Sequence, residues 1–481
     1  MITSQRMAAV DANAAALGVP RKQLMESSGN AVAREVEALA DPGAQVALVC
    51  GRGNNGGDAM VAARFLSEYE PTVHLLGRPA AIATDIAREN WDALIEAEID
   101  ARVVRDSEAF DPGDPAVIVD AILGTGVAGA LREPERSVVE RVNETDAAVL
   151  SVDVPTGVDP DTGNRTGGED GVAVDADRIV TFHDRTPGLA DIDADVTVAN
   201  IGIPEAAERF TGPGDLLRLD RRPDSHKGDN GEVLVVGGGP YAGAPALSAT
   251  AALRAGADLV RVACPEAVAR EVQGFSPNLI VHPFPGERFA LAHVDRVLGL
   301  AAEHDAIVFG PGLGDAEGTL GAVREFLVSF DGRAVIDADA LGVVPETETA
   351  ATLVCTPHQG ELREMGGPAA DDWETRAERV SDFAAELGHT LLVKGRYDVV
   401  TDGDDTRVNR TGNPGMTVGG TGDVLAGAVG ALLADQPPFE AAAIGAYANG
   451  RSGDVVAEER GHGLVATDLI DRLPEALRTD E

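Results

Sequence analysis

Short apolar runs recur along this chain and alternate with alanine-rich stretches of helical periodicity. In the first half the runs are VALVC (46–50), VHLLG (73–77), AVIVDAIL (116–123), AAVLSVDVP (147–155) and RIVTF (178–182). Such runs are typical of strands buried on both faces, and parallel strands need a crossover, usually a helix, between them. The sequence therefore predicts an α/β fold with a parallel sheet between layers of helices.

The second half repeats this scheme, which predicts two domains. Its runs are GEVLVVGGG (231–239), DLVRVAC (258–264), DAIVFGPG (305–312), RAVIDADAL (333–341) and LLVKG (391–395). A helical region over 3–40 precedes the first strand. The segment 211–231 between the halves is charged and lacks a long apolar run. We therefore predict domains at 1–216 and 217–481, and 481 residues suffice for two sizeable cores.

The charge balance is unusual and restricts the possible partners. Aspartate and glutamate total 80 against 39 basic residues, and the net charge is −41. Lysine occurs only as Lys22, Lys227 and Lys394. Dispersed acidic residues with few lysines indicate a protein adapted to high salt, where screening removes the self-repulsion. A nucleic-acid mimic or an acidic tail would concentrate the acids in blocks, and the charge argues against nucleic acid as a partner.

Other features favour a cytoplasmic protein without a membrane partner. Cys50, Cys264 and Cys355 each follow an apolar run, so we expect buried free thiols rather than disulfides. The histidines show no metal-ligand spacing, and no apolar signal core opens the chain. Residues 233–253 carry no charge, but their glycines and prolines predict a strand, a loop and a helix rather than a membrane span.

The most informative motif is GNPGMTVGGTGDVLAG (412–427), which runs into an apolar helical stretch over 424–434. Its glycines free several backbone N–H groups to point at one spot, and the helix start adds partial positive charge. This combination predicts an anion hole with Asp423 at its rim, where a phosphoryl group and a hydroxyl could meet.

Three loops in the first half follow the same physical recipe of strand, loop and helix start. They are GRGNNGGDAM (51–60), DAILGTGVAGA (120–130) and SVDVPTGVDPDTG (151–163). Loops at the carboxyl ends of parallel strands converge on one crevice, so we expect a ligand site there. The side-chain oxygens of Asn54 and Asn55 suit a hard cation such as K⁺.

These loops, together with LMESSGNAVA (24–33) and TVANIGIP (197–204), closely resemble the NAD(P)H-hydrate epimerase domain over about residues 1–212. The resemblance implies a Rossmann-like three-layer α/β/α domain, with K⁺ bound by Asn55, Asp120 and Thr156. It implies Asp153 beside the nicotinamide as the acid–base group. The implied dinucleotide contacts, besides Asp153, are Asn54, Asn55, Gly56, Gly57, Asp58, Gly124, Thr125, Gly126, Val127, Ala128, Gly129 and Ala130.

One position departs from the epimerase pattern. The family usually reads NNGGDG, and here the last position is Ala59. We expect the added methyl group to narrow the loop and to affect the catalytic rate more than binding.

The second half contributes further strand-end motifs. GPGLG (310–314) follows a strand, IDADAL (336–341) supplies two aspartates and TPHQGE (356–361) supplies His358 and Glu361. His358 could bond a carboxamide or a hydroxyl, or it could be structural. Lys227 and Lys394 each precede a glycine in a loop, and a lysine retained in a lysine-poor chain invites a functional interpretation.

These motifs, with VKG and ANGRSGD (448–454), resemble ADP- or ATP-dependent NAD(P)H-hydrate dehydratase, a member of the ribokinase-like group, over about 220–475. The resemblance implies a ribokinase-like α/β/α domain in which Asp423 is the catalytic base. The implied contacts with the hydrated dinucleotide are Ala244, Gly312, Gly314, His358 and Asp423. The implied nucleotide contacts are Lys394, Gly395, Arg396, Tyr397, Asp398 and Gly422, although KGRYD departs from the usual KG-x-x-T.

Both resemblances together predict a bifunctional repair enzyme for hydrated NADH and NADPH. One domain would interconvert the R and S epimers, and the other would dehydrate the S form with Mg²⁺ and ADP, which is favoured over ATP. The resemblance also implies a homo-oligomer. Two alternatives stay open: a ribokinase-class small-molecule kinase with an accessory dinucleotide-binding domain, and a dinucleotide-binding scaffold without turnover. The NNGGD motif argues against the first alternative, and Asp153 with Asp423 argues against the second.

Overall fold

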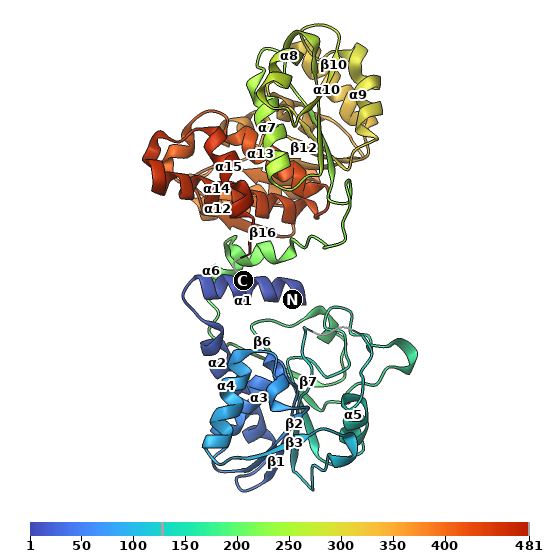
Figure 1. Cartoon of the computed structure of the whole chain (residues 1–481), viewed down its shortest axis with the longest axis vertical. Helices are drawn as coiled ribbons and strands as arrows, with labels where there is room; N and C mark the ends of the chain where they lie inside the picture. The colour runs from blue at the N-terminus through green and yellow to red at the C-terminus, as the bar shows by residue number, and fades with distance from the viewer. Residues whose placement is uncertain (127–128, 480–481) are drawn as a thin grey trace. The chain divides into compact units, whose positions relative to one another are not determined.

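The structure is a computed structural model that describes residues 1–126 and 129–479 (Figure 1). The chain forms two compact units, Met1–Glu205 (unit 1) and Ala206–Glu481 (unit 2). Residues that follow Glu205 belong to unit 2 because they bond to its last strand: Thr211 N donates to Val408 O at 3.1 Å, and Arg407 pairs with Asp215 at 3.0 Å. The domain boundary at 216/217 stays a prediction about the functional domains.

Unit 1 contains a seven-stranded sheet in the order β3-β2-β1-β4-β5-β6-β7, and every pair is parallel. Its strands are β1 (Gln45–Cys50), β2 (Glu70–Leu76), β3 (Asp100–Val104), β4 (Val117–Ala121), β5 (Ala148–Val152), β6 (Arg178–Phe182) and β7 (Asp195–Ala199). Its helices are α1 (Ser4–Ala16), α2 (Arg21–Leu39), α3 (Asn54–Phe65), α4 (Asp85–Glu96) and α5 (Glu135–Asn143), and α6 (Glu205–Arg209) spans the division between the units.

Unit 2 contains a nine-stranded sheet in the order β10-β9-β8-β11-β12-β13-β14-β15-β16, in which only the β14–β15 and β15–β16 pairs are antiparallel. Its strands are β8 (Glu232–Val236), β9 (Leu259–Pro265), β10 (Ile280–Phe284), β11 (Ala306–Phe309), β12 (Arg333–Ile336), β13 (Thr352–Cys355), β14 (Thr390–Val393), β15 (Asp398–Thr401) and β16 (Thr406–Asn409). Its helices are α7 (Gly243–Arg254), α8 (Glu266–Phe275), α9 (Val294–Ala301), α10 (Glu317–Ser329), α11 (Gln359–Glu364), α12 (Trp373–Leu387), α13 (Thr421–Leu433), α14 (Pro438–Arg460) and α15 (Ala466–Ala476).

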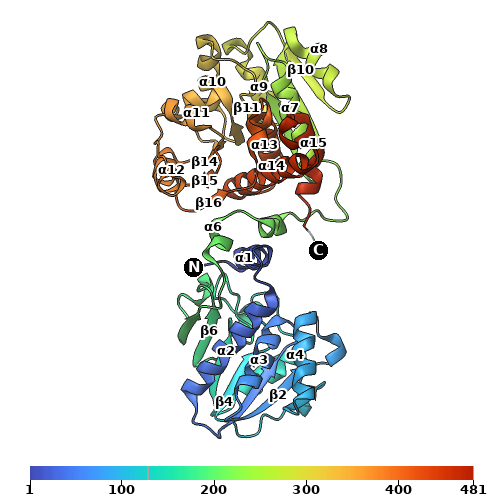
Figure 2. The ribbon, with the colours of Figure 1, turned by 90° about the vertical axis from the view of Figure 1, so that its left-hand side faces the viewer.

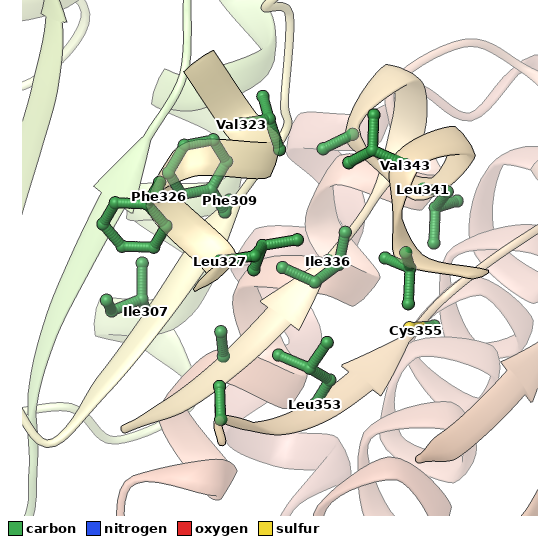
Figure 3. Packing of buried hydrophobic residues seen from close by; sticks show 14 of the residues in the cluster. Ile307, Phe309, Val323, Phe326, Leu327, Ile336, Leu341, Val343, Leu353 and Cys355 are labelled. Atoms are coloured by element: carbon green, nitrogen blue, oxygen red, sulfur yellow. The ribbon is translucent and has the colours of Figure 1, made fainter. Parts of the chain in front are cut away.

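Each sheet is covered by apolar side chains on both faces. In unit 1, α2, α3 and α4 bury one face, as Figure 2 shows, and α5 packs on the other. In unit 2, α7, α13 and α14 pack on one face, while α9, α10 and α12 pack on the other. Figure 3 shows the second of these faces, where the ring of Phe309 from β11 lies 4.7 Å from that of Phe326 from α10, and Leu353 of β13 belongs to the same cluster. Both units are therefore three-layer α/β/α domains, which confirms the predicted fold class.

Local expectations from the sequence are met as well. The uncharged segment 233–253 forms β8, a loop and most of α7. Among the described residues, no helix combines the length and the apolar character needed to cross a bilayer. Cys50, Cys264 and Cys355 are buried free thiols.

Candidate active sites

The order of strands places the first candidate site at the carboxyl end of β1. This strand lies between β2 and β4, so the loops after β1 and β4 leave the sheet in opposite directions and open a crevice. Gly51 lets the backbone of the loop after β4 approach the end of β1 closely, because a Cβ at this position would lie 1.8 Å from Ile122 O. The predicted motifs at 51–60 and 120–130 therefore meet at this switch point.

A cavity of about 460 Å³ lies at this switch point. Its lining includes Asn55, Gly124 and Thr125 from the predicted loops. Three carboxylic acids also line it: Asp11 from α1, Asp58 from α3 and Asp153 after β5. A cavity of this size can hold part of a dinucleotide, and the three acids, with Arg21 also in the lining, provide groups that can transfer protons.

Asp153 is held in a strained backbone conformation at the cavity wall. Its φ of 70° lies in the left-handed region, which is unusual for a residue with a side chain. Thr125 N donates to Asp153 Oδ2 at 3.2 Å, so the loop after β4 fixes the carboxyl. Burial raises the pKa of the Asp153 carboxyl, and the bonds from Thr125 partly oppose this shift.

The other two acids have raised pKa values for related reasons. Burial raises the pKa of Asp58 well above its usual range, and the neighbouring carboxyls of Asp153 and Asp11 add to the shift. Burial also raises the pKa of Asp11 to about 6, although the charge of Arg21 opposes it. Carboxyls that are partly protonated near neutral pH can both give and take protons.

The residues predicted to bind K⁺ lie beside this cavity. Asp120 is almost fully buried, and it accepts hydrogen bonds from Thr156 Oγ1 at 2.6 Å, from Thr156 N at 2.9 Å and from Ser151 Oγ at 2.8 Å. Asn55 Oδ1 is buried and has no hydrogen-bond partner. Asn54 differs from Asn55 because its oxygen already accepts from Thr84 Oγ1 at 2.8 Å. The orphaned oxygen fits a cation ligand at Asn55, and Asn54 is already satisfied.

The remaining predicted contacts of unit 1 fall in three places. Gly56 and Gly57 lie in the first turns of α3, where a Cβ at Gly56 would approach Gly51 O to 2.2 Å. Gly126 lines the cavity. Gly129 and Ala130 are exposed, and Ala130 lies beside Gly167. Val127 and Ala128 lie outside the described residues.

Ala59, the departure from the family pattern, lies inside α3 rather than in a loop. Its side chain is fully buried in the core formed by α2, α3 and α4. The expectation that its methyl group narrows the loop is therefore wrong about the location, because the helix already begins at Asn54.

Unit 2 repeats the switch point with different loops. Its β8 lies between β9 and β11, and a Cβ at Gly237 would lie 2.3 Å from Pro311 O. The predicted binding residues meet here: a Cβ at Gly312 would lie 3.3 Å from Ala244 Cβ, and one at Gly314 would lie 2.9 Å from Pro240 Cγ. The structure thus brings Ala244, Gly312 and Gly314 together.

Asp423 lies in the first turn of α13, as the glycine motif predicts. The helix begins after Gly420, whose φ of 97° needs a glycine. The first backbone N–H groups of a helix have no partners within it and attract anions. The pKa of Asp423 is raised to about 7, because burial and the nearby Asp337 carboxylate raise it more than the Lys394 ammonium lowers it. A carboxylate with such a pKa is suited to act as a base at neutral pH.

Lys394 supplies the positive charge next to Asp423. Its Nζ is 3.0 Å from Asp337 Oδ1 and 3.7 Å from Glu361 Oε2. A Cβ at Gly422 would lie 3.4 Å from the same Nζ. Burial acts to lower the pKa of the lysine, but the two carboxylates outweigh it and raise the pKa. The ammonium group therefore stays charged at the start of α13.

The rest of the KGRYD loop divides into structural and exposed groups. Asp398 closes the loop, since it accepts from Gly395 N and from Asn409 Nδ2, both at 2.9 Å. Burial raises the pKa of Asp398 to about 6. The Tyr397 ring lies 5.5 Å from that of Trp373, and Arg396 is exposed above Tyr397. Gly395, Arg396 and Tyr397 remain predicted nucleotide contacts.

His358 has a structural role that the sequence left open. Its Nδ1 accepts from Gly360 N at 2.8 Å and from Glu361 N at 3.1 Å, so the ring caps α11. Because the side chain is 59% exposed, its other nitrogen can still bond a ligand. The two interpretations of His358 are therefore compatible.

Two acidic residues at these sites were not predicted as functional. Asp337 was noted only as part of a motif, and its contact with Lys394 depends on β12 and β14 lying on either side of β13. Asp11 lies in a helix far from the glycine loops in sequence. No local signal in the sequence marks either contact, because both arise from the topology.

Comparisons with known proteins agree with this geometry. A family model described as YjeF-related protein N-terminus matches residues 21–188, and one described as NAD(P)H-hydrate dehydratase matches residues 233–475. The chain is 43% identical to the bifunctional NAD(P)H-hydrate repair enzyme of Methanothermobacter thermautotrophicus, covering 98% of this chain and 94% of that protein. It is 42% identical to the enzyme of the same name from Archaeoglobus fulgidus, covering 99% and 98%. Among solved structures, a ribokinase-like superfamily protein from Enterococcus faecalis matches 56% of this chain and 95% of its own, with a TM-score of 0.50 and 25% identity.

Proposed function

The chain belongs to the family of bifunctional NAD(P)H-hydrate repair enzymes, and on that premise we propose a two-step repair of hydrated NADH and NADPH. Water added across the 5,6 double bond of the nicotinamide leaves a hydroxyl at C6, in R or S configuration. Unit 1 interconverts the two epimers with Asp153 as an acid–base group. Unit 2 dehydrates the S form at the expense of ADP. The functional domains correspond to 1–216 and 217–481.

The observation that carries the proposal for unit 2 is the position of Asp423. It has a pKa of about 7, lies in the first turn of α13 and has the Lys394 ammonium close by. Asp423 accepts the proton of the C6 hydroxyl as that oxygen attacks the terminal phosphoryl group of ADP. The N–H groups of α13 and the ammonium of Lys394 stabilise the charge on the transferring group. Elimination of phosphate, a far better leaving group than hydroxide, then restores the double bond.

Binding of the dinucleotide in unit 2 falls to Ala244, Gly312, Gly314 and His358, and binding of ADP to Gly422 and residues 394–398. Mg²⁺ would be held at this site together with the bound nucleotide. Mg²⁺ is usually held by phosphate oxygens with only one or two carboxylates, and Asp337 is such a carboxylate. When bound, the ion neutralises charge on the phosphates.

In unit 1 the residues fit K⁺. The buried Asn55 oxygen lacks a partner, and Asp120 accepts its hydrogen bonds from hydroxyl and backbone N–H groups. A potassium ion at Asn55, Asp120 and Thr156 would supply positive charge beside a buried carboxyl. The loops after β1 and β4 then position the nicotinamide against Asp153.

The decisive experiment is recovery of absorbance at 340 nm from a mixture of R and S NADH-hydrate with ADP, Mg²⁺ and K⁺ in high salt. Full recovery is expected. Recovery of the S fraction alone would contradict the epimerase activity, and no recovery with ADP or ATP would contradict the proposal. A stable phosphorylated alcohol would instead support the ribokinase-class kinase.

We also propose that this is a cytoplasmic homo-oligomer adapted to high salt. The excess of 80 acidic over 39 basic residues supports the salt adaptation. Below roughly molar salt the carboxylates repel one another, so activity and thermal stability should fall. Full activity at about 0.1 M NaCl would contradict the adaptation, and light scattering in high salt would test the oligomer.

A further inference from the structure

The N-terminal helix α1 brings a carboxyl into the unit 1 cavity from outside the glycine loops. Met7, Ala8 and Asp11 of this helix all line the cavity. The start of the helix is tied to unit 1, since Ser4 Oγ donates to Asp161 Oδ2 at 2.7 Å and Ile2 N donates to Arg185 O at 3.0 Å. Asp11 is therefore held in place by the fold.

Asp11 and Asp153 reach the cavity from different elements, the helix α1 and the end of β5. The two carboxyls interact electrostatically, and the charges of Arg21 and His183 also act on Asp11. Asp58, the third acid, is buried in the first turns of α3. Its carboxyl has a hydrogen bond with the side chain of Ser28 on α2. All three acids line the cavity. Among the hydrogen bonds of the described residues, hydroxyl groups donate to Asp58 and Asp153, and none is found for Asp11.

Inversion at C6 makes a demand that one carboxyl cannot meet. The hydroxyl of one epimer lies on one face of the ring, and the hydroxyl of the other epimer lies on the opposite face. If oxygen departs from one face and water adds to the other, one group must donate a proton and a second group must accept one. Inversion by this loss and addition of water is therefore served by two proton-transferring groups in one cavity, one for each face of the ring.

We infer that Asp11 is the second proton-transferring group of the epimerisation and acts as the partner of Asp153. The inference rests on the proposed function of unit 1 and goes beyond it by naming the group and the bond that breaks.

The step balances as follows. The protonated carboxyl of the pair gives its proton to the C6 hydroxyl, the C6–O bond breaks and its electron pair leaves with the oxygen as water. The lone pair of N1 forms a C6=N1 bond. A second water then attacks C6 from the opposite face, its electron pair forms the new C6–O bond, and the other carboxylate takes its proton. One water leaves, one enters, and the proton returns between turnovers through solvent.

The test uses the full chain with Asp423→Asn, so that the S form accumulates, and pure R NADH-hydrate in high KCl. Epimerisation is followed by chromatography, and the reaction is repeated in ¹⁸O-labelled water. In Asp11→Asn we expect kcat to fall about 100-fold or more, with KM changed less than about threefold. Asp92→Asn, a matched change at an exposed residue of α4, should leave both constants unchanged. Asp11→Glu should recover part of the rate.

The outcomes separate this inference from the function beneath it. No epimerisation by the parent chain would contradict the proposed function of unit 1. Epimerisation by the parent with an equal rate in Asp11→Asn would overturn the role of Asp11 alone. Product that retains ¹⁶O would overturn the C6–O step and point to opening of the C6–N1 bond. Two results together support the inference. The product gains one ¹⁸O per inversion, and the pH profile of Asp11→Asn lacks a limb that the parent chain shows.

Discussion

The two candidate sites have the same architecture and differ in the charged groups around their acids. In each unit a glycine directly follows the strand that comes first in the chain, Gly51 after β1 and Gly237 after β8, and it lets a carbonyl of the neighbouring loop approach. In unit 1 the resulting cavity is lined by three carboxylic acids. In unit 2 the proposed base, Asp423, lies at a helix start and has the Lys394 ammonium close by. One scaffold is thus suited either to moving protons on an uncharged ring or to handling a phosphoryl group, depending on the charges placed at the switch point.

The largest expected effect comes from one Asp→Asn substitution in each unit, which should abolish one activity and leave the other. Asp423→Asn should lower kcat/KM for dehydration about 1000-fold or more, because the hydroxyl loses its base, and epimerisation should be unchanged. Asp153→Asn should do the reverse, so that only the S fraction of a mixture recovers absorbance at 340 nm. If either variant lost both activities, the comparison of two separate sites would be wrong.

The second effect tests the positive charge that distinguishes unit 2. Lys394→Met removes the group that lowers the pKa of Asp423 and pairs with Asp337 at 3.0 Å. We expect kcat/KM for dehydration to fall about 100-fold and its pH limb to move to higher pH. The matched control is Lys227→Met, because Lys227 is exposed before β8. Equal activity of the two variants would show that the charge at Lys394 is dispensable.

These two lysines also show what the sequence could and could not reveal. The strand pattern predicted the three-layer domains, and the glycine motifs placed Asp153 and Asp423 at strand and helix ends, because those signals are local. The contact of Lys394 with Asp337 and the entry of Asp11 into the cavity were not predictable, since both depend on which strands and helices become neighbours. The antiparallel pair β15–β16 was likewise missed, because its strands DVVT and TRVN contain only two apolar residues and one apolar residue, too few for a recognisable run.

A third, smaller effect compares the pH dependence of the two activities. The pKa of Asp423 is about 7, and the base must be ionised to accept a proton. Dehydration should therefore fall about tenfold for each pH unit below 7 and level off above it. In the direction in which Asp11 takes the proton, its pKa of about 6 places the acidic limb of epimerisation about one unit lower. Coincident limbs in the two pH profiles would contradict this difference between the sites.

The smallest effect tests whether helix packing positions each acid independently. A Cβ at Gly29 of α2 would lie 2.8 Å from Asp58 O and 2.3 Å from Val61 Cγ1 on α3, and a Cβ at Gly427 of α13 would lie 2.0 Å from Ser248 O on α7. Ser248 Oγ also donates to Asp423 O at 2.8 Å, so the same helix contact holds the base.

Gly29→Ala and Gly427→Ala should each lower the free energy of unfolding by about 1–3 kcal/mol through overpacking, and each should impair only the activity of its own unit. Gly321→Ala is the control, because a Cβ there on α10 meets nothing within 4 Å. That variant should gain up to about 1 kcal/mol from the better helix former. Denaturant unfolding in high salt measures both changes. Equal stability of Gly427→Ala and Gly321→Ala would mean that α7 and α13 can separate freely, and the close contact would then not be what positions Asp423.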